Sequence, residues 1–572
     1  MRNLWIVTVL MLSANIAMAQ NSKLARDLNG ISPNSKVDVI IQYKHIPTET
    51  DHQNVRAHGG SLKHRYARVR SGGYTVPASA LAQLAGNSEI AYISPDRKVT
   101  GKLDLTAATV GAAAAWNLGL DGSGIGVAII DSGITEVNDL ANKGVSRVVY
   151  SQDFVGTGTD DVYGHGTHVA GIVAGNGNDS NCTTCTRAMK GIAPNVNLIN
   201  LRVLDQNGAT TDSVLIAAID RAIALASTYN IKVINLSVGR PVFESSLQDP
   251  LDQAVEAAWQ AGIVVVVAAG NDGRDNYSNN YGYGTITAPG NDPYVITVGA
   301  MKDEGTPSRT DDLIASYSSK GPTAIDNYAK PDIVAPGNLT VSLLANINDT
   351  LPVAEPTTLI SNKYYNSGGD GSLSTVYYTL SGTSMATPVV SGAAALLLQQ
   401  DPSLTPDQVK ARLMRTASKT FPTSSQAVDP TTAAVYTSYY DIFTVGAGYL
   451  DIGAALADQT AFSGSAVSPV VLFNSTTGVG QLYCGQYTVC ADQAVWGTQA
   501  VWGTSAFVNG TQAIWADQSV WGTQAIAATQ AVWGTQAVWG TQAVWGTQAI
   551  WGTQAVWGTQ AVWGTATLLG EK

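Results

Sequence analysis

Charged side chains are scarce in this chain. Lysine, arginine, aspartate and glutamate make up only 13% of its 572 residues, and the formal net charge is −11. Proteins that bind the phosphate backbone of nucleic acids need clustered positive charge. The composition therefore argues against a nucleic-acid partner. Hydrophobic residues make up 45% of the sequence, which is enough for a large core, and the length predicts several domains.

Long apolar runs are also missing, apart from one at the N-terminus. That run covers residues 4–12, follows Met1-Arg2 and precedes the small-residue pattern Ala17-Met18-Ala19. It is too short to span a bilayer comfortably, and its flanks are typical of a secretory signal peptide. We therefore predict a signal peptide at residues 1–19, cleaved near Ala19. The mature protein is expected to be secreted (extracellular or periplasmic), with no transmembrane segment.

Cysteine is rare as well, with four residues in two close pairs. Cys182 is near Cys185, and Cys484 is near Cys490. In an exported protein, each close pair favours a local disulfide. A zinc site would need the two distant pairs to meet, and it is the weaker alternative.

Residues 20–102 have the pattern of a small mixed domain. Strand-like stretches lie at residues 37–43, 66–69, 74–76 and 90–93, and helical stretches lie at 53–62 and 77–86. Their order, β-α-β-β-α-β, predicts a split βαβ domain. This fold alone does not indicate a function.

Residues 103–460 alternate between buried strands and helices. Short apolar runs lie at residues 127–131, 197–204, 233–238, 263–269 and 294–300, and they are typical of parallel strands. Helical stretches at 213–227 and from 250 to before Gly262 separate some of them. The pattern predicts a doubly wound α/β domain with a mostly parallel sheet. Ligands in such folds bind at the carboxyl ends of strands, where Asp131 and Asn271 stand.

Histidine is the scarcest of the residues that could act as a base. Of six histidines, four lie in residues 20–102, and the large domain has only His165 and His168. Ser384 begins a predicted helix, where its hydroxyl and backbone N–H meet the positive end of the helix dipole. A serine there is either an N-cap or a nucleophile, and a nucleophile needs a base near neutral pH.

His165 lies between two glycines at the mouth of a predicted helix, so its ring can reach a neighbour. His168 lies one turn into that helix, and we interpret it as a packed structural residue. Asp131 would orient the imidazole of His165 and stabilise its cation.

Three motifs resemble the signatures of the subtilisin-like (subtilase) serine peptidases. They are Asp131-Ser132-Gly133, Gly164-His165-Gly166-Thr167-His168 and Gly382-Thr383-Ser384-Met385-Ala386, and they follow the family's chain order. The resemblance implies a serine endopeptidase that acts on polypeptides, with Ser384 as nucleophile, His165 as general base and then acid, and Asp131 as orienter. Asn271 would share the oxyanion hole with the Ser384 N–H.

The resemblance also implies substrate-binding and metal positions. Ser237, Val238 and Gly239 resemble the segment that pairs with the substrate backbone, which favours broad specificity. Thr287 and Ala288 fall near the expected S1 pocket. No cofactor is expected for the chemistry. Asp139 resembles a calcium ligand, so structural calcium stays an open alternative, although the partner loop at residues 176–185 departs from the family pattern.

Residues 20–102 resemble the family's inhibitory propeptide, which implies self-cleavage near residues 98–105. Three of its histidines, His52, His58 and His64, suggest a pH-sensitive release of this domain. The alternative is that they are solvated surface residues.

The rest of the chain falls outside the family pattern. Residues 338–378 are interpreted as a surface insertion, and residues 461–494 as a small β linker module. From residue 495 to 572 a VWGTQA hexad repeats, which favours stacked β-structure or a low-complexity tail. Its tryptophan rows suggest contact with a surface or a carbohydrate. A surface-binding protein is therefore the competing hypothesis to the peptidase.

Overall fold

The computed structural model describes residues 23–25, 28, 31–66, 70–95, 103–275, 280–429, 432–474, 479–483 and 571. The predicted signal peptide, the Cys484–Cys490 pair and the hexad repeats up to residue 570 lie outside the described residues. The chain divides into two compact units, residues 1–100 and 101–572. Within the described part, no helix is long and apolar enough to cross a membrane.

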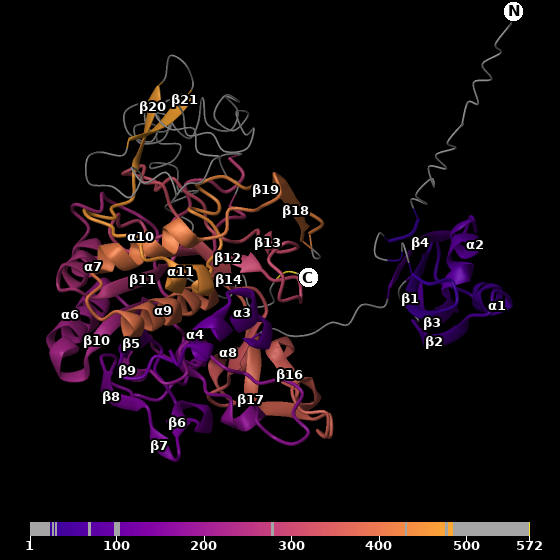
Figure 1. The fold of residues 1–572 in the computed structure, drawn as a ribbon, viewed down its shortest axis with the longest axis horizontal. Coiled ribbons are helices and arrows are strands. Elements are labelled where there is room, and N and C mark those ends of the chain that lie inside the picture. The colour runs from indigo at the N-terminus through magenta and orange to yellow at the C-terminus, as the bar shows by residue number, and fades with distance from the viewer. Residues whose placement is uncertain are drawn as a thin grey trace, which may run out of the picture. The chain divides into compact units, whose positions relative to one another are not determined.

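The first unit has the predicted β-α-β-β-α-β order (Figure 1). Its antiparallel sheet has the order β2-β3-β1-β4. The elements are β1 (Lys36–Tyr43), α1 (Glu49–Ala57), β2 (Ser61–Arg65), β3 (Ser71–Pro77), η2 (Ala78–Ala80), α2 (Leu81–Ala85) and β4 (Ile90–Pro95). The predicted helix at 53–62 is misplaced. Helix α1 begins earlier because Asp51 accepts the Thr48 N–H in a capping box, and residues 61 and 62 belong to β2 instead.

The second unit is built on an eight-stranded sheet. Its order is β13-β12-β11-β10-β5-β9-β8, with β14 also paired to β12, and every pairing except β12 with β13 is parallel. The strands are β5 (Gly126–Asp131), β8 (Val148–Asp153), β9 (Asn197–Arg202), β10 (Ile231–Leu236), β11 (Val264–Ala268), β12 (Ile296–Lys302), β13 (Leu313–Ile314) and β14 (Ile333–Pro336). The five predicted strands match five of these to within a few residues. Strands β5 and β11 are buried along their whole length, which explains their unbroken apolar sequences.

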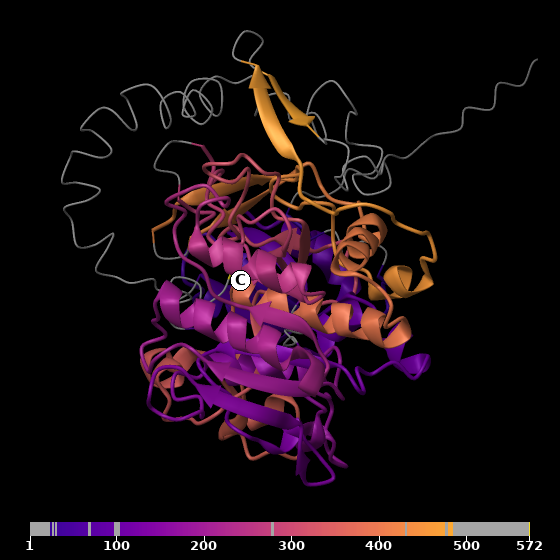
Figure 2. The ribbon, with the colours of Figure 1, turned by 90° about the vertical axis from the view of Figure 1, so that its left-hand side faces the viewer.

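Two pairs of helices cover the sheet. Helices α6 (Asp212–Tyr229) and α7 (Pro250–Gln260) pack together, and α5 (His165–Ala174) packs on α9 (Thr383–Gln400). Figure 2 views the molecule from the α6 and α7 side, with these helices in front of the strands. Further helices of this unit are α3 (Leu103–Thr109), α4 (Ala112–Asn117), η3 (Asn138–Leu140), η4 (Asn178–Ser180), α10 (Pro406–Thr416) and α11 (Ile452–Ala457). This arrangement is the doubly wound α/β domain that the pattern predicts.

The segment that we interpreted as a surface insertion is folded into the unit. It forms an antiparallel sheet of order β15-β17-β16, from β15 (Thr340–Leu343), β16 (Leu359–Ser361) and β17 (Leu373–Leu380), with α8 (Thr350–Ala354), η5 (Pro356–Thr358) and η6 (Asn362–Tyr364) between them. Tyr377 and Tyr378 of β17 are both fully buried. The prediction of a surface excursion is therefore wrong for β15, which is buried along its length, and for these two tyrosines.

The remaining strands form short antiparallel pairs: β6 (Ala141–Asn142) with β7 (Val145–Ser146), β18 (Ser424–Val428) with β19 (Val435–Tyr439), and β20 (Val470–Asn474) with β21 (Val479–Tyr483).

The chain just before β20 is held by a buried ionic cluster. Asp332 contacts Lys330 Nζ at 2.7 Å and Lys410 Nζ at 3.1 Å, and it accepts the Ser468 hydroxyl at 2.6 Å.

Candidate active site

Three neighbouring strands end at one place in the sheet. Strand β5 ends with Asp131, Ser237 follows β10, and Asn271 follows β11 after two residues. The order β5-β10-β11 puts these carboxyl ends side by side. Helices α5 and α9 begin with His165 and Thr383, and the contacts described below bring both helix starts to this edge.

Asp131 and His165 are directly bonded. Nδ1 of His165 lies 2.7 Å from Oδ1 of Asp131, which also accepts the Ser132 N–H at 2.7 Å. Asp131 is fully buried and His165 nearly so. Because the carboxylate accepts at Nδ1, the other ring nitrogen, Nε2, is left to take up a proton. Burial disfavours the imidazolium, but the negative charge and hydrogen bond of Asp131 outweigh it and raise the pKa of His165.

A second buried carboxylate, Asp161, fixes the start of α5. It accepts the Gly164 N–H at 2.7 Å, the Thr167 N–H at 2.8 Å and the Ser132 hydroxyl at 2.8 Å. An anion here satisfies free N–H groups at the positive end of the helix. Burial raises the pKa of Asp161 despite these hydrogen bonds. The sequence analysis missed this residue, although an acidic residue four positions before His165 was a usable signal.

His168 is a structural residue, as the sequence analysis suggested. It is fully buried, its Nε2 lies 3.1 Å from the carbonyl oxygen of Thr340, and its ring packs edge-on against Tyr378 at 5.1 Å. Burial, reinforced by the nearby His165, lowers the pKa of His168 to about 3. It therefore stays neutral and does not compete with His165 as a base.

Ser384 and Ser237 bind each other reciprocally. The Ser384 hydroxyl donates to the Ser237 carbonyl oxygen at 3.1 Å, and the Ser237 hydroxyl donates to the Ser384 carbonyl oxygen at 2.8 Å. No hydrogen bond joins Ser384 to His165, although both residues are described. Such catalytic hydrogen bonds are often loose in the absence of substrate.

The side chain of Asn271 is held in one orientation. Its Oδ1 accepts the Thr383 N–H at 2.9 Å and the Thr383 hydroxyl at 3.1 Å, so Nδ2 faces the other way. Gly382 has a φ of +151°, and a Cβ added there would lie 3.3 Å from Asn271 Nδ2 and 3.6 Å from Ser384 N. Asn271 Oδ1 would also lie 3.6 Å from that Cβ. Two groups that can donate N–H hydrogen bonds thus border the space in front of Gly382, as an oxyanion hole requires.

The predicted substrate-binding residues come together beside this site. Ser237, Val238 and Gly239 are buried at the end of β10. The next residue, Arg240, exchanges two backbone hydrogen bonds of 2.8 Å with Ala288. Thr287 donates its N–H to the Ala269 carbonyl at 3.1 Å, and its hydroxyl donates to the same oxygen at 3.3 Å.

The surroundings of Asp139 do not suit a calcium ion. Its Oδ2 accepts the Tyr377 hydroxyl at 2.6 Å, and its Oδ1 accepts the Asp179 N–H at 2.7 Å. Both carboxylate oxygens therefore face hydrogen-bond donors, whereas a calcium site gathers oxygen acceptors. Within the described residues, no group of three or more His, Cys, Asp or Glu side chains could hold a metal ion. In the neighbouring loop, Cys182 and Cys185 are disulfide-bonded, with their Cα atoms 4.9 Å apart.

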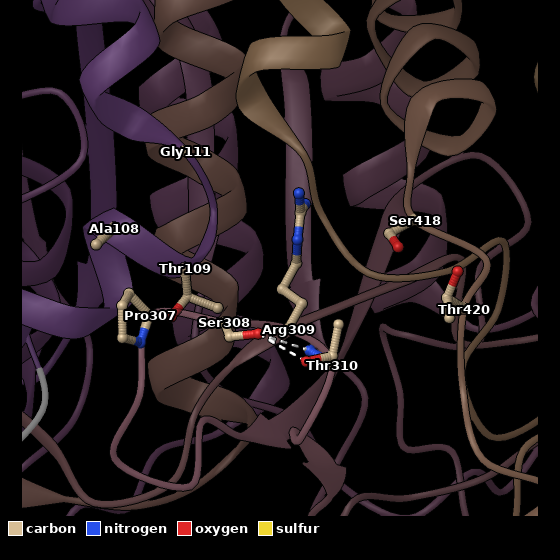
Figure 3. A pocket seen from close by; sticks show the side chains of 9 residues that line it. All are labelled: Ala108, Thr109, Gly111, Pro307, Ser308, Arg309, Thr310, Ser418 and Thr420. Atoms are coloured by element: carbon tan, nitrogen blue, oxygen red, sulfur yellow. Dashed lines mark hydrogen bonds between the residues drawn. The ribbon is translucent and has the colours of Figure 1, made fainter.

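A pocket of about 390 Å³ lies away from these residues (Figure 3). It is lined by Ala108, Thr109, Gly111, Pro307, Ser308, Arg309, Thr310, Ser418 and Thr420. Its one ionisable side chain, Arg309, is bound to Asp451 at 2.5 Å. None of the lining side chains could act as the general base that activates a nucleophile, so the pocket is not the active site.

Several known proteins are similar to this chain in sequence. The model of the subtilase family, Peptidase S8, matches residues 122–436. Serine protease AprX of Bacillus subtilis (strain 168) is 37% identical over 397 residues, which are 66% of this chain and 82% of the relative. Subtilisin E of the same organism is 30% identical over 424 residues, 73% of this chain and 94% of the relative.

Among solved structures, the crystal structure of a cold adapted subtilisin-like serine proteinase has 30% sequence identity and a TM-score of 0.36. The match covers 52% of this chain and 84% of that one. The family match spans more than half of the chain and includes Asp131, His165 and Ser384. The chain therefore belongs to the subtilase family and is a subtilisin-like serine endopeptidase.

Proposed function

We propose that Ser384, His165 and Asp131 carry out peptide hydrolysis through an acyl-enzyme. The observation that carries this proposal is the buried 2.7 Å hydrogen bond between Asp131 and His165. Nε2 of His165 takes the proton of the Ser384 hydroxyl as the serine oxygen attacks the peptide carbonyl, and then returns it to the leaving amine. Asp131 keeps the ring oriented and stabilises the imidazolium. Water then cleaves the acyl-enzyme by the same proton transfers.

The oxyanion of the tetrahedral intermediate binds in front of Gly382. Asn271 Nδ2 and the Ser384 N–H donate to it, because Thr383 holds Asn271 by its Oδ1. Removing one such side-chain donor lowers the rate by roughly 10²–10³, a cost that was measured in subtilisin itself.

Substrates are extended polypeptides bound mainly through their backbone. Ser237, Val238 and Gly239 border the nucleophile on one side, while Thr287 and Ala288 line the specificity pocket. Backbone pairing makes few demands on substrate side chains, so specificity is broad. The side chain of Thr287 would shorten the pocket, which favours an apolar P1 side chain.

The protein is exported, and its first unit acts as an inhibitory propeptide. The β-α-β-β-α-β order of that unit supports this role, together with the sequence pattern at residues 1–19. Ser384 cleaves the chain near residues 98–105 and so separates the two units. Contact of the hexad repeats with a surface or a carbohydrate stays a prediction.

The test compares the full-length protein with Ser384→Ala and with Ser227→Ala, an exposed serine on α6. Intact mass and N-terminal sequencing show where each purified chain begins. We expect the parent and Ser227→Ala to begin near residue 100 and to hydrolyse a peptide substrate. Ser384→Ala should keep residues 20–102 and show no hydrolysis. Equal trimming and equal hydrolysis in all three chains would contradict the assignment of Ser384.

A further inference from the structure

A carboxylate from the far end of the chain is buried in the second unit. Glu571, the penultimate residue, is only 7% exposed. Its Oε1 accepts the Ser316 N–H at 2.9 Å, Arg274 Nη2 at 2.7 Å and the Ser316 hydroxyl, and its Oε2 lies 3.5 Å from Lys302 Nζ. The peptide backbone of Glu571 is bound as well: its N–H donates to Asn338 Oδ1 at 2.8 Å, and its carbonyl accepts from Asn338 Nδ2 at 2.9 Å.

Four separate segments of the scaffold supply these contacts. Arg274 belongs to the loop after β11, Lys302 ends β12, Ser316 follows β13, and Asn338 lies between β14 and β15. The side chains of Lys302, Ser316 and Asn338 are themselves buried. The site is therefore part of the folded domain and does not depend on the residues that precede Glu571.

The charges at this site favour an anion. Lys302 also lies 3.3 Å from Glu304, and Arg274 lies 3.7 Å from Asp429, but Glu571 is the carboxylate that reaches both cations. Leaving two partly desolvated cations without it would be unfavourable. The side chain of Asn338 adds a donor and an acceptor that match a peptide unit. Together these groups recognise a glutamate residue within a peptide.

We propose that Arg274, Lys302, Ser316 and Asn338 form a carboxylate-binding site whose ligand is Glu571 of the same chain. A second attachment lies before the repeats, because Ser468 joins the buried Asp332 cluster and Ala329 N donates to the Pro469 carbonyl at 2.8 Å. The chain is therefore bound to the catalytic unit both at residues 468–469, before the repeats begin, and at Glu571.

The test uses the full-length Ser384→Ala chain, which cannot digest itself under the proposed mechanism. Carboxypeptidase B removes Lys572 only if the backbone around Glu571 leaves its site, and intact mass follows that release. Glu571→Gln removes the ligand charge, and Arg274→Gln removes one receptor charge without altering the cleaved sequence. Glu244→Gln, an exposed glutamate, is the matched control. Free peptides that end in Glu-Lys and Gln-Lys give the intrinsic difference in cleavage rate.

We expect both site variants to release Lys572 at least about tenfold faster than the parent and Glu244→Gln, after correction for the peptides. Tenfold corresponds to the loss of one charge-assisted hydrogen bond. The Ser316 amide, which donates to Glu571, should also exchange its hydrogen faster in both variants. Equal release rates in all chains, or acceleration by Arg274→Gln alone, would overturn the assignment of Glu571 as the ligand.

Discussion

Tyr377 donates a hydrogen bond of 2.6 Å to Oδ2 of Asp139, and both residues are buried. The two residues lie 238 positions apart in the sequence. Together with the Asp179 N–H, Tyr377 satisfies a carboxylate that the family resemblance suggested as a calcium ligand. The protein itself thus supplies at Asp139 the partners that a metal ion would otherwise provide.

Asp139 should therefore not contribute to any effect of calcium on the stability of the protein. We expect Asp139→Asn to leave the difference between the urea midpoints in EGTA and in millimolar calcium unchanged, measured by circular dichroism on the Ser384→Ala chain. A calcium-dependent midpoint that disappears in Asp139→Asn would show that Asp139 does bind the ion.

Tyr377→Phe should lower the free energy of unfolding by about 1–3 kcal/mol, since it leaves one Asp139 oxygen without a donor. Burial raises the pKa of Asp139 to about 6, and the Tyr377 hydrogen bond opposes that rise. The lost donor matters most when Asp139 is ionised, so the loss should be larger at pH 8 than at pH 5. Urea unfolding at both pH values measures the loss in free energy of unfolding. Tyr365→Phe, at a neighbouring buried tyrosine, is the comparison variant. Equal losses at both pH values would contradict this account.

Asp161→Asn should impair catalysis and shift its pH dependence. The charge of Asp161 contributes to the raised pKa of His165, though less than Asp131 does. Without that charge, the pKa of His165 falls, so the acid limb of the kcat/KM profile should move to lower pH. Weaker positioning of α5 should also lower kcat, by up to about 10²-fold, the low end of what a positioned acid–base group supplies. Asp160→Asn, at an exposed neighbouring position, should change neither kcat nor the pH of the acid limb. If the acid limb does not shift in Asp161→Asn, the charge of Asp161 does not raise the pKa of His165.

Gly382→Ala should abolish most activity without unfolding the protein. The added methyl group would stand beside both proposed oxyanion donors, 3.3 Å from Asn271 Nδ2 and 3.6 Å from Ser384 N. We expect kcat to fall by roughly 10²-fold or more, measured on a peptide substrate. Gly262 has a φ of +85° and no atom within 4 Å of an added Cβ. Gly262→Ala therefore controls for backbone strain alone, and equal losses of kcat in the two variants would argue against blockage.

His52 should make the first unit sensitive to acid. It is fully buried, its Nδ1 lies 2.8 Å from the Tyr74 hydroxyl, and the Tyr43 hydroxyl donates to that same hydroxyl at 3.1 Å. The idea that His52 is a solvated surface residue is therefore wrong. Burial lowers the pKa of His52, so the folded unit binds fewer protons than the unfolded chain. The stability that this contributes is present above the unfolded pKa near 6.5 and is lost as the pH falls below it.

In the full-length Ser384→Ala chain, the protection factors of the amides in residues 36–66 and 70–95 should therefore fall between pH 7 and pH 5, once the slower intrinsic exchange at pH 5 is corrected for. His52→Gln should reduce that fall, whereas His64→Gln, at an exposed strand position, should not. An unchanged fall in His52→Gln would assign the acid sensitivity to other groups.

Local sequence patterns predicted the sheet and the residues at its edge. The unbroken apolar runs of β5 and β11 are buried on both sides, and such runs identify parallel strands. Ser384, His165 and Asp131 were found because each stands in a glycine-rich motif at an element boundary. The buried strands and these motifs are set by residues that are close in the sequence, so a local sequence pattern can reveal them.

Contacts between distant segments were beyond the reach of such patterns. Nothing around Asp139 indicates Tyr377, and the polar sequence between residues 338 and 378 hides two buried tyrosines. Glu571 also lies 233 residues from Asn338, so no local rule connects them. The start of α1 was predicted too late, although Thr48 and Asp51 have the spacing of a capping box.

Strand β17 carries two adjacent anchors. Tyr377 reaches Asp139, and the hydroxyl of Tyr378 donates to the carbonyl oxygen of Gly164, the residue before His165. A deletion within residues 338–380 that removes β17 would therefore remove both hydrogen bonds. The bond from Tyr378 holds the loop that positions the general base His165. For protein engineering, this segment belongs with the catalytic framework.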